Sequence, residues 1–217
     1  MSGKVTVVTS DEHMEIMRLE SEPFGTNAYM LICKDTNESI LIDAPGNAGT
    51  IKEKLQDTRP QYILMTHGHM DHTGALEELR SSLGATIAAH KKDAGQLPVK
   101  PDKLLGGGEY VRCGKIDLEV IHTPGHTPGS LCFRAGNYLF SGDTIFPGGP
   151  GKTASPQDFR LIVDSIEKMI MPLPGDTTIL PGHGEPTDLE NERDKFNTFK
   201  ERDQGEAVCG DVTWLGT

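Results

Sequence analysis

The chain has 217 residues, and its 32 acidic and 21 basic side chains give a net charge of -11 at pH 7. A chain of this length can bury a core without a disulfide or a structural metal. The negative charge opposes binding to the phosphates of nucleic acid and to anionic membrane surfaces. No apolar stretch approaches the roughly 20 residues that span a bilayer, and the N-terminal residues lack the apolar core of a signal peptide. We therefore expect a cytoplasmic globular protein that binds neither nucleic acid nor membrane.

The cysteine pattern indicates neither a zinc knuckle nor a disulfide framework, because no two cysteines have the close spacing of such sites. We expect free thiols, most of them buried. The four residues are Cys33, Cys113, Cys132 and Cys209.

The first half of the chain opens with short alternating or β-branched runs, each bounded by turn residues, which predict the strands of a first sheet. These runs are residues 4–8, 15–19, 28–33 and 40–43. Helical and strand patterns then alternate: a helix around 51–55, a strand at 62–65, a helix at 75–83 and a strand at 86–89. The Gly- and Pro-rich residues 95–108 are expected to form a loop.

The second half repeats this order. Strands are predicted at 116–121, 131–134, 138–140 and 178–180, with helices at 156–170 and about 188–200. Pro156 near the start of its helix and Pro172 beyond its end occupy positions that proline favours. Strands followed by helices in both halves predict one α/β domain over residues 1–217, with two sheets that each have helices on the outer face.

The strongest chemical signal directly follows the predicted strand at 62–65. Within six positions the chain has His67, His69, Asp71 and His72. Imidazole and carboxylate are ligands that Zn(II), Fe(II) and Mn(II) accept, and side chains two positions apart on an extended segment can converge on one ion. Four such residues together favour metal binding over a solvated polar turn.

Three further candidate ligands follow predicted strands, and each stands in a turn rich in glycine or proline. They are His126 in Thr-Pro-Gly-His, Asp143 in Ser-Gly-Asp-Thr and His183 in Pro-Gly-His-Gly. Such turns let the backbone approach a shared cleft. Taken alone, the two histidines could be turn or capping residues and Asp143 an Asx-turn residue. Together with the first four they make seven ligands, a number that suits two metal ions.

Other motifs are assigned no chemistry. His122 is expected to be a packed or supporting histidine, and His13 and His90 are expected at the surface. Residues 146–153 nearly spell a phosphate-binding loop, but Phe146 replaces its first glycine and the prolines remove amide donors. We therefore expect no nucleotide binding.

In this order the ligand motifs resemble those of the metallo-β-lactamase superfamily, specifically the glyoxalase II-like hydrolases, over about residues 28–185. The resemblance implies a four-layer αββα sandwich with the site at one edge of the two sheets. It also implies two divalent transition-metal ions, zinc first, with iron or manganese as alternatives. The implied ligand sets are His67, His69 and His126 for the first ion, Asp71, His72 and His183 for the second, and Asp143 as the bridge.

The resemblance further implies hydrolysis of a small thioester or related ester, with Asp71 and Asp143 as the catalytic carboxylates. True β-lactamases have a cysteine at the position of Asp143, which argues against antibiotic hydrolysis. Water held between two metal ions ionises near neutral pH, and a thiolate leaves without much help from a protein acid. An anionic small molecule suits the positive cluster, and Lys152 matches a lysine that related glutathione thioesterases use to bind substrate. Too few residues follow His183 for the helical substrate domain of full-length glyoxalase II.

Two alternatives remain open at this point. One is a mononuclear iron persulfide dioxygenase, a similar branch that uses a subset of the ligands resembling His67, His126 and Asp143. That branch typically has an arginine at the position of Lys152. The other is a metal-binding module without catalytic activity, which the complete ligand set disfavours.

Overall fold

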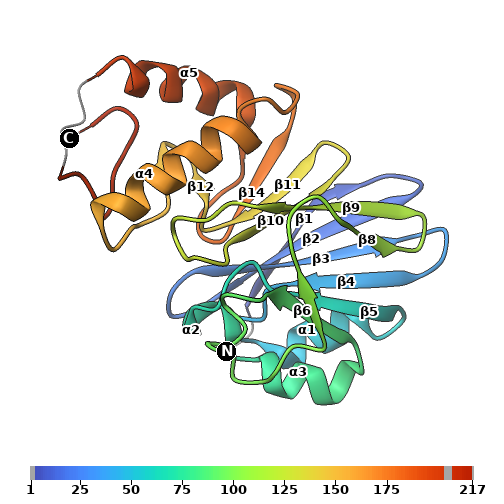
Figure 1. Cartoon of the computed structure of the whole chain (residues 1–217). Helices are drawn as coiled ribbons and strands as arrows, with labels where there is room; N and C mark the ends of the chain where they lie inside the picture. The colour runs from blue at the N-terminus through green and yellow to red at the C-terminus, as the bar shows by residue number, and fades with distance from the viewer. Residues whose placement is uncertain (1–2, 203–206, 217) are drawn as a thin grey trace.

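Two β-sheets pack face to face in the computed structural model, which describes residues 3–202 and 207–216 (Figure 1). The first sheet has seven strands in the order β1-β2-β3-β4-β5-β6-β7, and the second has six in the order β15-β14-β11-β10-β9-β8. Helices cover the two outer faces. The predicted αββα sandwich is therefore confirmed.

The first sheet combines hairpins with parallel crossovers. Its strands are β1 (Lys4–Ser10), β2 (Met14–Ser21), β3 (Thr26–Cys33), β4 (Glu38–Ile42), β5 (Arg59–Leu64), β6 (Thr86–His90) and β7 (Lys103–Leu105). The first four are antiparallel neighbours, whereas β4, β5, β6 and β7 pair in parallel. Parallel pairing needs a crossover, which α1 (Ala48–Leu55) provides before β5 and α3 (Leu76–Leu83) before β6. Strand β7 lies inside the segment that the sequence predicted as loop, so that prediction was wrong; three residues are too few to show a period.

The second sheet is mostly antiparallel. Its strands are β8 (Tyr110–Cys113), β9 (Ile116–His122), β10 (Leu131–Ala135), β11 (Tyr138–Gly142), β14 (Thr178–Pro181) and β15 (Thr187–Asp188). The parallel pair β11 and β14 is joined through α4 (Pro156–Ser165) and the π-helical turn Ile166–Ile170. The predictions missed β8 and the small hairpin of β12 (Ile145–Phe146) and β13 (Gly149–Pro150). Because this hairpin occupies the glycine-rich segment and α4 begins only at Pro156, no helix N-terminus follows Lys152, as a phosphate-binding loop would require.

Three apolar layers hold the sandwich together. Buried side chains such as Ile16, Val120 and Phe133 fill the space between the two sheets. A second layer lies under α1 and α3, and a third lies under α4 and α5 (Leu189–Lys200). Fully buried Trp214 packs edge-on against Phe196 in the third layer, with ring centroids 5.2 Å apart. None of the helices in the described part of the chain is long and apolar enough to cross a membrane.

The cysteines behave as predicted. None of them forms a disulfide within residues 3–202 and 207–216, and Cys33, Cys113 and Cys132 are buried while Cys209 is exposed.

The topology brings four turns to one edge of the sandwich. Strands β5, β9, β11 and β14 each end at this edge, and each is followed by one of the histidine- or aspartate-bearing turns. Two backbone hydrogen bonds join the sheets there: Leu131 N donates to Thr66 O (2.8 Å) and Asn27 N donates to Gly182 O (2.7 Å). The edge is therefore a fixed platform for side chains from distant parts of the sequence.

Candidate metal centre

All seven predicted ligands come together at this edge. His67 and His69 lie in the turn after β5, and Asp71 and His72 lie on the short helix α2 (Met70–Thr73). The turns after β9, β11 and β14 supply the other three. Their donor atoms form three groups within 4.8 Å: His67, His69 and His126; His67, His72 and Asp143; and Asp71, His72 and His183.

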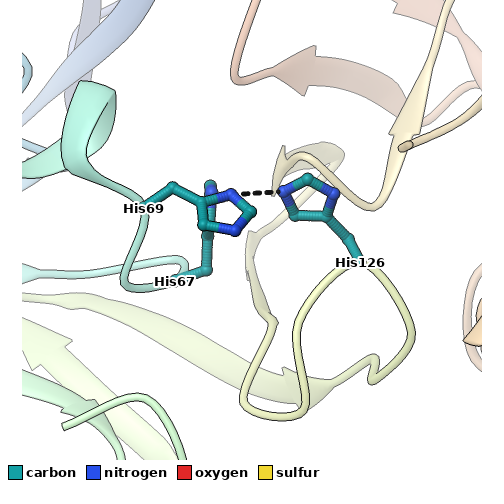
Figure 2. Close-up of side chains that lie close together, drawn as sticks. All are labelled: His67, His69 and His126. Carbon is teal, nitrogen blue, oxygen red and sulfur yellow. Dashed lines mark hydrogen bonds between the residues drawn. The ribbon is translucent and has the colours of Figure 1, made fainter. Parts of the chain in front are cut away.

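The first group is built from two loops that face each other (Figure 2). His69 Nδ1 lies 2.9 Å from His126 Nε2, and the ring of His67 lies beside both, with centroid distances of 4.7 and 4.8 Å. One nitrogen atom from each of the three imidazoles therefore points to one small volume.

Asp143 stands between the first group and the third, which is Asp71, His72 and His183. Its Oδ1 lies 3.3 Å from His72 Nε2, and its Oδ2 lies 3.5 Å from His126 Nε2 and 3.6 Å from His183 Nε2. Asp71 Oδ2 lies 3.2 Å from the same nitrogen of His183. One carboxylate thus faces histidines of both groups, the geometry that a bridging ligand requires.

Buried donor atoms without a partner test whether these residues fit a metal. Among the described residues, His67 Nε2, His72 Nε2 and Asp143 Oδ1 are buried and none of them makes a well-aligned hydrogen bond, although the last two lie 3.3 Å apart. Leaving such atoms unsatisfied costs roughly 1–3 kcal/mol each, so native proteins seldom do so. All three belong to the converging groups, and imidazole with carboxylate is the donor set of zinc and iron sites. The residues fit divalent transition-metal ions.

Each candidate ligand histidine other than His69 is held in place by a contact of its Nδ1 atom, the ring nitrogen that faces away from the cluster. His72 Nδ1 lies 2.8 Å from Asp43 Oδ2, and His126 Nδ1 lies 2.8 Å from the main-chain oxygen of Lys152. His183 Nδ1 lies 3.2 Å from Phe24 O. Such contacts orient an imidazole, so that Nε2 would be available to an ion.

Asp43 is a functional residue that the sequence analysis missed, since it was predicted only as the last residue of a strand. It is buried, and its φ of 57° lies in the left-handed region that non-glycine residues seldom adopt. Besides His72 it accepts hydrogen bonds from Thr66 N (2.8 Å) and Thr66 Oγ1 (2.7 Å), and Thr66 Oγ1 lies 3.0 Å from His67 Nδ1. Its carboxylate thereby orients two of the candidate ligands.

The charges in the cluster shift its titrations in opposite directions. Burial disfavours the imidazolium of His72, but the carboxylates of Asp143 and Asp43 outweigh burial and raise its pKa well above the ordinary value. Burial, together with neighbouring His72, lowers the pKa of His67. Burial opposes ionisation of Asp143, yet the histidines around it, His72 first, hold its pKa far below the usual range. The site therefore stabilises a carboxylate beside positive charge, which a cation can supply.

A second set of residues missed in the sequence holds the turn of His183 against the first sheet. Buried Arg18 donates from Nη1 to Gly184 O (2.9 Å) and from Nη2 to Glu185 Oε1 (2.6 Å). Asn27 Nδ2 also donates to Gly184 O (2.9 Å), and the Tyr29 hydroxyl donates to Pro181 O (2.8 Å). These contacts span more than 150 positions, so no local pattern could reveal them.

Lys152 contacts the cluster through its main chain. Its side chain is 69% exposed, and Nζ lies 3.7 Å from the carboxylate of Asp211. The carbonyl that orients His126 does not depend on the identity of this side chain.

His122 lies outside the three donor groups. Its ring stacks on His90 with centroids 4.2 Å apart and an interplanar angle of 14°, and its Nε2 lies 3.1 Å from Pro128 O. The prediction that His90 is a surface residue was wrong: it is 5% exposed, because β6 is an inner strand and His122 covers its last residue.

We expect His122→Ala to leave the metal content unchanged, since this ring packs and supports a turn and offers no donor to the cluster. Metal analysis of the purified variant beside His126→Ala, which removes a donor, makes the comparison. Loss of one ion from the His122 variant would show that the wrong histidine was assigned.

Comparison with known proteins gives a consistent picture. A sequence model of the metallo-beta-lactamase superfamily matches residues 21–195. The hydroxyacylglutathione hydrolase GloC of Haemophilus influenzae is 31% identical over 192 residues, covering 78% of this chain and 90% of that protein. The crystal structure of the B3 metallo-beta-lactamase BLEG-1 has a TM-score of 0.76 at 29% identity, covering 82% and 96% of the two chains. TTHA1623 in a di-iron-bound form has a TM-score of 0.68 at 28% identity, covering 81% and 96%.

Proposed function

Because the chain belongs to the metallo-β-lactamase superfamily, we propose that it is a hydrolase that uses two divalent transition-metal ions to cleave a small thioester or related ester. The observation that supports this most is Asp143, whose two carboxylate oxygens face histidines of the first and the third donor group. The relative named hydroxyacylglutathione hydrolase supports the thioester class.

Two of the three donor groups support the proposed division of ligands. His67, His69 and His126 would hold one ion, Asp71, His72 and His183 the other, and Asp143 would touch both. When bound, two such ions lower the pKa of a water held between them and polarise a substrate carbonyl. The chain's own part is to fix that geometry.

Several side chains of the protein orient the candidate ligands for this reaction. Asp43 and Thr66 hold His72 and His67 in place before substrate arrives, so no reorganisation is needed. Asp71 and Asp143 would balance part of the charge of two divalent ions and leave the centre positive, which would attract a small anionic substrate. A thiolate leaves without a proton donor, so the absence of a general acid from the proposed set suits a thioester.

Zinc is the first choice for both ions because nitrogen and carboxylate ligands suit it. Iron and manganese accept the same donors. The similarity to a protein solved in a di-iron form supports iron as the main alternative.

A substrate panel on the metal-loaded protein tests the proposal. It contains a thioester, a lactone, a phosphodiester and, because BLEG-1 is named a β-lactamase, a β-lactam. We expect thioester hydrolysis that a chelator abolishes and added metal restores. No hydrolysis of any ester by fully loaded protein would contradict the proposal and favour a binding module. Oxygen consumption with a persulfide at one iron per chain would favour the dioxygenase, for which His67, His126 and Asp143 suffice.

We also propose that the ammonium of Lys152 binds a carboxylate on the thiol part of the substrate. The side chain is exposed and its ammonium lies 3.7 Å from the exposed carboxylate of Asp211, a weak surface contact that a ligand can replace. Contact with a part of the substrate remote from the carbonyl stabilises ground and transition states alike.

Lys152→Ala should therefore raise KM and nearly keep kcat. A charge-assisted contact is worth roughly 1.5–3 kcal/mol, so kcat/KM for an anionic thioester should fall by about ten- to a hundredfold. A neutral thioester, measured in parallel, should show little change. Equal losses on both substrates would refute substrate binding and point to an effect on the turn that holds His126.

A further inference from the structure

The two most exposed large apolar side chains in the described part of the chain both adjoin the candidate metal centre. Met70 is 81% exposed and Phe24 is 65% exposed. Large apolar side chains in water are unremarkable when scattered, but two beside one site form a surface that a ligand can cover.

Phe24 is tied to the centre by its backbone. Its carbonyl oxygen lies 3.2 Å from His183 Nδ1, and two residues later Thr26 Oγ1 donates to Asp71 Oδ2 (3.3 Å). The turn between β2 and β3 and the first residue of β3 therefore contact both Asp71 and His183.

Met70 adjoins the centre from another element. It is the first residue of α2, between the candidate ligands His69 and Asp71. The helical turn directs His72 into the interior, where it is fully buried, and leaves Met70 in solvent. Its exposure is thus a consequence of the geometry that brings the ligands inward.

Phe146 adds a third apolar side chain from the hairpin β12–β13. Its ring centroid lies 6.2 Å from that of His183, and it is partly buried. We call Phe24, Met70 and Phe146 the apolar rim. It borders Asp71 and His183, whose side chains are 26% and 29% exposed, whereas His67 and His72 are closed off from solvent. The rim therefore lies on the accessible side of the centre.

We propose that the apolar rim binds the acyl chain of the substrate, so that the enzyme prefers esters of apolar carboxylic acids to acetyl esters. This inference rests on the proposed hydrolase function and specifies its substrate class. The main chain of Lys152 contacts His126 of the first donor group, so this lysine adjoins the group of ligands that the apolar rim does not border. A substrate would then lie across the centre, with its apolar acyl part over Asp71 and His183 and its anionic thiol part toward Lys152.

A chain-length series measures the effect. Acetyl, butanoyl, hexanoyl and octanoyl thioesters of one anionic thiol are compared on the metal-loaded protein. Each buried methylene should raise kcat/KM by about two- to fourfold until the rim is covered. Phe24→Ser and Met70→Ser should each lower the octanoyl to acetyl ratio of kcat/KM by at least about threefold, because each removes part of the surface that the chain covers.

Tyr110→Ser is the matched control. Tyr110 is 63% exposed, nearly the same as Phe24, but it lies beside Glu119, Arg134 and Gly136, near the turn between β10 and β11 at the opposite end of the second sheet. This variant should keep the wild-type ratio. Metal analysis of all variants should give the wild-type content, which separates an effect on the rim from damage to the centre.

Binding supplies a readout that does not depend on turnover. Calorimetric titration with butanoate, hexanoate and octanoate should show affinity rising with chain length in the wild type and in Tyr110→Ser, and rising less in the two rim variants. A flat series in the wild type, or equal slopes in rim and control variants, would overturn the proposal. If no ester is hydrolysed but affinity still rises with length, the hydrolase function fails and the apolar rim stands as a ligand site.

Discussion

Asp143→Asn should lower kcat for a thioester by at least about a hundredfold, because activation of water at a metal pair depends on the bridging carboxylate. Its Oδ1 faces His72, and its Oδ2 faces both His126 and His183. An amide has no charge to place between them, and one of its two terminal atoms becomes a donor that faces an imidazole nitrogen. His126→Ala, which removes a donor of the first group, should lower kcat at least as much. Steady-state kinetics and metal analysis of the same preparations measure both effects.

A surface variant controls for the loss of one negative charge. Asp117 forms an exposed ion pair with Arg112, with Oδ1 2.8 Å from Arg112 Nε. Asp117→Asn should keep wild-type turnover, since exposed pairs of this kind contribute little. Full activity in Asp143→Asn would exclude a bridging role for that carboxylate.

Gly182→Ala should be nearly as damaging, although it changes no donor. A Cβ at this position would lie 2.1 Å from Asp143 Oδ1 and 2.7 Å from His72 Cε1, distances that no real Cβ occupies. The carboxylate of Asp143 and the imidazole of His72 must therefore move away from the added methyl group. Because displacement of a reacting group by about 1 Å can cost a hundredfold in rate, we expect kcat to fall by roughly that factor.

Gly95→Ala provides the comparison for this substitution. A Cβ there would have no atom within 4 Å, and the backbone does not require glycine. This variant should retain metal content and turnover. Wild-type kinetics in Gly182→Ala would show that the four turns are more adaptable than their packing indicates.

A strand can be predicted from the sequence only when enough consecutive residues carry the pattern of alternating polar and apolar side chains. Strands β1 to β6 have five to eight residues with clear patterning, and the predictions for β1 to β4 agree with the structure to within a few residues. Strands β7 and β8 have only three and four residues, too few for a period to stand out. Burial of His90 depends on a neighbour from a different sheet, so no local pattern could indicate it.

The same contrast applies to the candidate centre. Four of its residues lie within six positions of each other, and the other three stand in turns that begin where strands end, so local sequence suffices to predict that these seven side chains come together. The supporting residues gave no such signal. Arg18 and Tyr29 act through contacts with the turn of His183, and Asp43 acts through His72, 29 positions away. The one local signal for Asp43 is its position, because it is a carboxylate directly after a buried strand.

The number of metal ions per chain tests the central claim most directly. Protein purified without added metal is loaded with zinc, dialysed to remove loosely held ions and analysed for every transition metal. Seven donors exceed what one tetrahedral ion accepts, so we expect about two ions per chain. Persistent binding of about one iron ion per chain under zinc-rich conditions would contradict a dinuclear hydrolytic centre.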